Sequence, residues 1–171
     1  MTTHERSLEP IADADLGTLA ALAVQDREEF FARNPRWGQL YGDRLLCVAL
    51  CQGAGLHFVD RTTGVKDFDV WTFYAGHPTA PFPVRRRWTK DFGESRFGPD
   101  PFEPEQYRGR RVDLLARSIP CEVGANPVEA LRQYLSTSAT NTARLLAQKA
   151  VVLIDPRALR GVVAWPIREG G

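Results

Sequence analysis

Hydrophobic and polar residues alternate in two segments of the chain, and this alternation predicts two strands of a sheet. In residues 65–74, aromatic or β-branched residues occupy the even positions from 68 to 74, and aspartates occupy positions 67 and 69. In residues 110–118, apolar residues at 112, 114 and 116 alternate with a face that carries Asp113. Successive side chains of a strand point to opposite faces, so each strand is expected to turn one face toward a core and its acidic side chains away from it.

Continuous apolar runs predict two further strands. Leu45–Leu50 ends at the turn Gln52-Gly53-Ala54-Gly55, and residues 149–154 are apolar and β-branched up to Asp155-Pro156. Six apolar residues do not by themselves distinguish a strand from a buried helix, so a helix stays the alternative for the first run.

Capping signals predict the helices. Asn126 at the cap, Pro127 at the first position and Glu129 at the third predict a helix to about Leu135. Two more helices are expected. One runs from Asp13 to about Phe31 and is ended by Asn34-Pro35, and the other runs from Thr140 to about Gln148.

Residues 75–108 form the least regular part of the sequence. They are dense in proline and glycine, and six aromatic residues lie among the prolines from Phe82 onward. Aromatic residues at this density predict a packed loop rather than a disordered linker. A loop of this length within a compact domain is usually functional.

Together these elements predict an α/β (or α+β) fold, a mixed sheet with flanking helices on one side. The 171 residues fit one domain spanning 1–171, and 43% hydrophobic with 25% charged residues excludes a disordered or fibrous chain. A net charge of +1 supplies no global field that would attract nucleic acid or a membrane. Three cysteines in no metal or disulfide spacing, and no apolar run of membrane-spanning length, predict a soluble cytoplasmic protein.

The aspartates of the two alternating strands are the candidate chemistry. Asp67 and Asp69 project from one face of their strand, about 7 Å apart along it, and Asp113 lies between Val112 and Leu114 on the other strand. Carboxylates are preferred ligands of Mg²⁺. Two Mg²⁺ ions about 4 Å apart can activate an attacking oxygen and stabilise a leaving one. Convergence of the two strands would let these three aspartates hold such a pair.

A glycine turn and several cations are candidates for binding phosphate. Gly53-Ala54-Gly55 lies between a strand and a helix start, where backbone N–H groups are exposed to anions. His57 could donate to a phosphate, although a lone histidine is more often structural. Arg85, in a run of three arginines, could clamp a triphosphate or an acidic acceptor. Lys66 is expected to face away from the aspartates, and the end of a helix accounts for Lys149.

Two further residues on the acidic faces have two interpretations each. Trp71 could stack on a nucleobase, but core packing is the more common use of a tryptophan on a strand. Arg111 shares a face with Asp113, which suits an ion pair as well as a ligand contact.

The order of these motifs resembles the polymerase-beta-type nucleotidyltransferase superfamily. Its pattern is a strand ending in Gly-Gly or Gly-Ser, an apolar Asp-x-Asp strand, and a later strand with one carboxylate between apolar residues. Here Gly53 precedes Asp67-Phe68-Asp69 by 14 positions, and Val112-Asp113-Leu114 supplies the last element. The resemblance covers residues 45–116. It implies transfer of a nucleoside monophosphate from an NTP to an unspecified acceptor, with pyrophosphate leaving. Ala54 stands where the family commonly has serine.

Two other functions stay open. A metal-dependent nuclease would usually have a lysine two residues after an acid, but Trp71 follows Asp69 and Leu115 follows Asp113. The other alternative is a catalytically inactive nucleotide- or protein-binding module on the same fold, which Ala54 favours.

Overall fold

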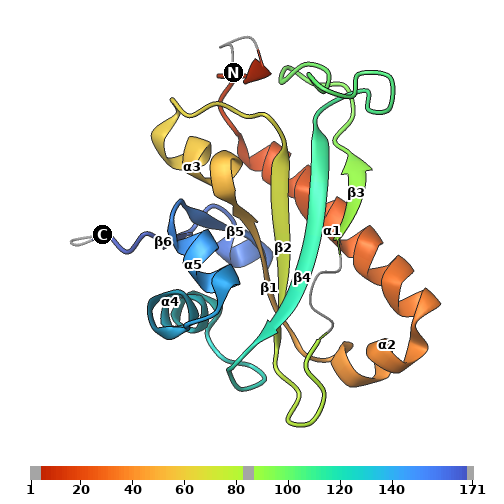
Figure 1. Ribbon diagram of the computed structural model, residues 1–171, viewed down its shortest axis with the longest axis vertical. Helices are drawn as coiled ribbons and strands as arrows, with labels where there is room; N and C mark the ends of the chain where they lie inside the picture. The colour runs from red at the N-terminus through yellow and green to blue at the C-terminus, as the bar shows by residue number, and fades with distance from the viewer. Residues whose placement is uncertain (1–4, 83–86, 169–171) are drawn as a thin grey trace.

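The computed structural model describes residues 5–82 and 87–168, which build one mixed six-stranded sheet with helices against it (Figure 1). The strand order is β3-β4-β2-β1-β5-β6, so β3 and β6 are the edge strands. β2 and β4 are parallel neighbours, and every other neighbouring pair is antiparallel. The expected mixed α/β fold is confirmed. The strands are β1 (Leu45–Cys51), β2 (Phe68–Ala75), β3 (Arg87–Asp91), β4 (Arg111–Ile119), β5 (Val151–Asp155) and β6 (Val163–Trp165).

Helices cover both faces of the sheet, so the expectation of helices on one side is wrong. Leu16 and Leu19 of α1 pack with one face, and Leu131 of α4 and Leu146 of α5 pack with the other. The Asn126 side chain caps α4 as expected, accepting from the backbone N–H of Glu129. The helices are α1 (Asp13–Arg33), α2 (Pro35–Tyr41), α3 (Gln52–Asp60), α4 (Pro127–Thr137) and α5 (Asn141–Ala147), with a short 3-10 helix at Arg157–Leu159.

The predicted alternation along β2 and β4 is present, but both faces of these strands are packed in a core, whereas the sequence predicted a core on one face only. Phe68, Val70 and Leu114 are buried beneath α1. Phe73, on the opposite face of β2, is buried against α4 and α5, where Trp71 packs beside it. The buried apolar area on both faces fixes the register of these strands, because a slip of one residue would exchange the faces.

The segment 75–108 is only partly the loop that its composition predicts. It contains β3, which pairs antiparallel with β4. Phe82, Phe97 and Tyr107 are buried, and Trp88 and Phe102 are exposed. Most of the segment therefore packs onto the domain. In the described part of the chain, no helix has the length and apolar character that crossing a membrane requires.

Candidate functional site

The three aspartates predicted from the sequence meet at one point of the sheet. The parallel register of β2 and β4 places Asp69 directly beside Asp113, and Asp67 immediately precedes β2. One carboxylate oxygen from each lies within 4.8 Å of those of the other two. Asp113 is buried at 2% exposure, whereas Asp67 and Asp69 are half-buried. An acidic cluster of this kind can hold a divalent cation through oxygen ligands.

Arg111 lies against this acidic cluster and balances part of its charge. Its Nη2 donates to Asp67 at 3.2 Å and to Asp113 at 3.3 Å, and its Nε lies 3.2 Å from the second Asp113 oxygen. Its Nη1 donates to Glu103 at 3.3 Å. Burial acts to lower the pKa of Arg111, but the charges of Asp113 and Asp67 outweigh it, so that pKa is raised. Arg111 is therefore an internal counter-cation, and the ion-pair interpretation is confirmed.

The electrostatics of the cluster resist a full negative charge. Burial raises the pKa of the Asp67 carboxyl, and the neighbouring Asp113 raises it further, while Arg111 and Lys66 act in the opposite direction. Burial, with the Asp69 charge, also raises the pKa of the Cys51 thiol well above its ordinary value. A bound cation would relieve this accumulation of negative charge.

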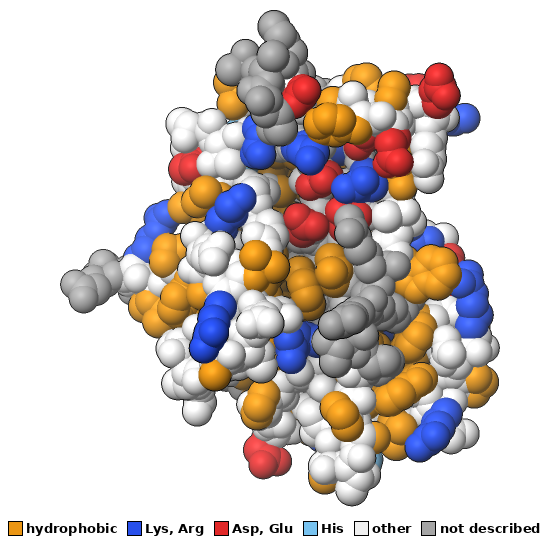
Figure 2. Space-filling model, in the orientation of Figure 1, with side chains coloured by type: hydrophobic (Ala, Val, Ile, Leu, Met, Phe, Trp, Pro, Cys, Tyr) orange, Lys and Arg blue, Asp and Glu red, His pale blue; other side chains and the backbone are white. Residues whose placement is uncertain are grey.

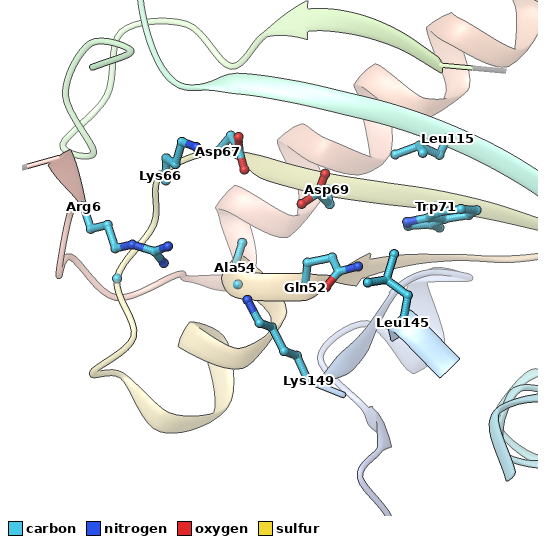
Figure 3. A pocket seen from close by; sticks show the side chains of 12 residues that line it. Arg6, Gln52, Ala54, Lys66, Asp67, Asp69, Trp71, Leu115, Leu145 and Lys149 are labelled. Atoms are coloured by element: carbon cyan, nitrogen blue, oxygen red, sulfur yellow. The ribbon is translucent and has the colours of Figure 1, made fainter. Parts of the chain in front are cut away.

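A cavity of about 400 Å³ opens beside the aspartates. Figure 3 shows its order: Arg6 and Lys66 at one end, Asp69 in the middle, and Trp71, Leu115 and Leu145 at the other end. In the space-filling view, acidic side chains gather in a hollow on this face, between basic and hydrophobic ones (Figure 2). The full lining is Arg6, Gln52, Gly53, Ala54, Gly64, Lys66, Asp67, Asp69, Trp71, Leu115, Leu145 and Lys149.

The predicted glycine turn forms the first turn of α3, which begins directly after β1. Gln52 has φ 59°, in the left-handed region that residues other than glycine rarely adopt. Gly53 and Ala54 line the cavity. Within the described residues Cys51 makes no side-chain cap to this turn, and the first N–H groups of a helix have no acceptor within the helix, which favours an anion at this position. Gly55 has a packing role instead, since a Cβ there would meet two backbone carbonyl oxygens at 2.6 and 2.9 Å.

His57 does not lie where a phosphate contact would require. It is 1% exposed, its Nδ1 accepts from the backbone N–H of Gly64 at 2.9 Å, and its Nε2 lies 2.9 Å from the carbonyl oxygen of Glu9. Both ring nitrogens therefore bind the backbone, and the structural interpretation of this histidine holds. Arg85, the other predicted phosphate contact, lies outside the described residues.

Three cations that sequence reasoning missed or set aside line the cavity. Lys66 lies beside the acidic cluster rather than away from it. Lys149 precedes β5, whose start lies beside the end of β1 because these strands are antiparallel. Arg6 is held there by a two-bond bridge in which Ser7 and Val65 exchange N–H···O bonds at 2.9 and 2.7 Å. The pairing of β1 with β5 was the missing signal for Lys149, and no local pattern marks Arg6.

Trp71 is also part of the lining, at the apolar end of the cavity. Its ring stacks beside that of Phe73, with centroids 6.1 Å apart and planes at 17°. Trp71 therefore packs on the core and also borders the cavity, and stacking on a nucleobase stays a prediction.

Comparisons with protein-family models, with curated proteins and with solved structures return no significant match for this chain.

Proposed function

We propose that this chain is a metal-dependent nucleotidyltransferase, which transfers a nucleoside monophosphate from an NTP to an acceptor and releases pyrophosphate. The observation that carries the proposal is the convergence of Asp67, Asp69 and Asp113 within 4.8 Å, beside a cavity that is also lined by the cations Arg6, Lys66 and Lys149. Carboxylates and cations in one cavity suit a metal-bound polyphosphate, which needs both.

The donor set fits Mg²⁺. Each aspartate offers carboxylate oxygens, the hard ligands that this ion prefers. Burial and then the charge of Asp113 raise the pKa of Asp67, and a bound cation would favour its ionised form. Asp67, Asp69 and Asp113 would hold the metal. When bound, two such ions supply charge neutralisation at the attacking and leaving oxygens of an in-line displacement.

The remaining lining residues position the nucleotide. Arg6, Lys66 and Lys149 bind the β- and γ-phosphates, which become the pyrophosphate leaving group. Backbone N–H groups at Gly53 and Ala54 contribute further donors at the start of α3. The acceptor oxygen attacks the α-phosphorus, the bond to the bridging oxygen breaks, and the acceptor proton passes to a carboxylate of the site. Fixed charges of this kind stabilise the transition state without reorganisation.

Calorimetric titration with each NTP, with and without Mg²⁺, tests the proposal. Wild-type protein is expected to bind in a Mg²⁺-dependent way, and Asp69→Asn is expected to lose that binding while keeping its fold. Asp43→Asn changes an exposed aspartate between α2 and β1 and is the matched control. Equal Mg-NTP affinity in Asp69→Asn and wild type would remove the acidic cluster from the function.

A catalytically inactive nucleotide-binding module is the second candidate. Two features favour it. Arg111 pairs with buried Asp113 and neutralises part of the carboxylate charge, and Ala54 stands in place of a serine. Its protein-binding form has less support, because Phe82, Phe97 and Tyr107 are buried, although Trp88 and Phe102 of the same segment are exposed. Pyrophosphate release during incubation with Mg-NTP and pooled hydroxyl acceptors separates the two candidates, since a binding module releases none.

A further inference from the structure

The cavity is organised along its length in the same order as the groups of a nucleotide. Arg6 and Lys66 lie at one end, Asp69 at the middle, and the side chains of Trp71 and Leu145 at the other end (Figure 3). An NTP has the same order, with polyphosphate, reacting α-phosphate, ribose and base. Cations suit only the anionic end of such a ligand, so the apolar end is left for the planar base.

We propose that the apolar end of the cavity binds the base of the NTP, and that the base it selects is adenine. This inference rests on the proposed function, because it names the nucleotide that the same site takes. Trp71 and Leu145 contact the two faces of the base, and the Gln52 amide hydrogen-bonds its edge.

The aromatic contact is provided by Trp71. Its ring borders the cavity and stacks beside the ring of Phe73, its neighbour on the same face of β2. Leu145 is 47% exposed although it is a large apolar residue, and its side chain points toward the same end of the cavity. Stacking of a base on an aromatic ring contributes about 1–3 kcal/mol in other proteins. The two-ring purines offer more stacking area than pyrimidines.

The hydrogen-bonding contact is provided by Gln52. Its side chain lies along the cavity between the aspartates and the apolar end (Figure 3). Its backbone has φ 59°, an unfavourable conformation for a residue with a Cβ, and such conformations concentrate at functional sites. A glutamine amide offers an acceptor and donors side by side. At the edge that carries N7, adenine presents an amino donor beside a ring acceptor, which complements the amide. Guanine presents two acceptors, N7 and O6, at that edge.

Calorimetric titration with Mg²⁺ and four ligands tests the inference on the full chain: ATP, ITP, UTP and inorganic triphosphate. ITP differs from ATP at the 6-position of the purine, where an oxygen replaces the amino group, and inorganic triphosphate has no base. Wild-type protein is expected to bind ATP on the order of tenfold more tightly than ITP, and UTP more weakly still. Gln52→Met, which keeps the length of the side chain without its amide, is expected to lose the preference for ATP over ITP.

Trp71→Leu is expected to bring the affinity for ATP close to that for inorganic triphosphate, and Trp71→Phe to give an intermediate value. The ratio of the two affinities is measured on one protein sample, so partial unfolding of a variant does not change it. Trp88→Leu alters an exposed tryptophan that does not line the cavity and is expected to keep the wild-type ratio.

Failure of the inference and failure of the proposed function give different results. Equal binding of all three NTPs, or an unchanged ratio in Trp71→Leu, would overturn the base site while inorganic triphosphate still bound with Mg²⁺. If the apolar end bound the acceptor substrate instead of the base, the three NTPs would likewise bind equally and the ratio would likewise be unchanged in Trp71→Leu. A tighter binding of ITP than ATP would overturn the choice of adenine. No binding of inorganic triphosphate or of any NTP would overturn the proposed function itself.

Discussion

Replacement of Arg111 by methionine is expected to destabilise the fold by about 3 kcal/mol when divalent metal is absent. Methionine keeps much of the apolar packing of the side chain and removes only the charge and the donors. The guanidinium contacts Asp67 and Asp113 at 3.2–3.3 Å, and Asp113 is 2% exposed, so the change removes a cation that lies against a buried carboxylate.

The magnitude follows from the geometry of this ion pair. Two unit charges about 4 Å apart attract by about 4 kcal/mol at an effective dielectric constant near 20. Removing one partner of a buried pair costs about 3–5 kcal/mol in other proteins. The lower end applies here, because the side chains of Arg111 and Asp67 are 25% and 20% exposed and water screens part of the interaction.

Urea unfolding followed by tryptophan fluorescence, in EDTA and again in Mg²⁺, measures both parts of the prediction. Mg²⁺ at ten times its dissociation constant stabilises a folded protein by about 1.4 kcal/mol. This gain is expected to be larger for Arg111→Met than for wild type, because the guanidinium no longer competes for the carboxylates. Arg96→Met, which removes a partly exposed partner of Asp15 and leaves the acidic cluster intact, is the control and is expected to cost about 1 kcal/mol while gaining as much from Mg²⁺ as wild type.

Two results would refute this reasoning. If Arg111→Met unfolded at the wild-type urea concentration in EDTA, the ion pair would contribute nothing net to stability. If Mg²⁺ stabilised both proteins equally, Arg111 and the metal would not share the acidic cluster.

Three other predictions concern the residues around the site. Gly55→Ala is expected to destabilise the fold by about 1–3 kcal/mol in urea unfolding, because its Cβ would clash with two carbonyl oxygens. In Gly53→Ala the new Cβ would lie 3.6 Å from its nearest neighbour, so this variant is expected to keep the wild-type stability. Equal stability of the two variants would contradict the clash at Gly55. The pKa of Asp67 is higher in the folded than in the unfolded protein, so its ionisation destabilises the fold above the folded-state pKa and has no effect below the unfolded-state pKa. Without metal, Asp67→Asn is therefore expected to melt at a higher temperature than wild type at pH 7, but not at pH 3. His57→Leu is expected to lose about 1–3 kcal/mol by leaving backbone groups unbonded, yet to bind Mg-NTP normally in calorimetry, and a selective loss of nucleotide binding would return this histidine to the site.

The acidic cluster could be predicted because two of its determinants are local. Alternation fixed the face of Asp69 and Asp113, and apolar neighbours marked both strands as buried. The two glycines of the first turn of α3 were correctly placed at a strand–helix junction, although of these two only Gly53 lines the cavity and Gly55 is needed for packing. Local patterns therefore predicted the acids and the position of the helix start.

The cationic half of the cavity could not be predicted in the same way, because it depends on contacts between distant segments. Arg6 reaches the cavity through a bridge between Ser7 and Val65, 58 positions apart in the sequence. The same long-range path places the carbonyl of Glu9 against His57 and so fixes the role of that histidine. β3 was hidden for another reason, since its five residues are mostly polar and lie within a proline-rich segment.

The two edges of the sheet bear on how this protein behaves at high concentration. A long exposed edge strand offers unpaired N–H and C=O groups to another molecule and promotes intermolecular β-sheet. β3 is five residues long and β6 only three, and Arg132 of α4 donates to the carbonyl oxygens of Ala164 and Val163 in β6. Within residues 87–168 a second molecule therefore finds only short stretches of edge backbone to extend, which disfavours aggregation through intermolecular strand pairing.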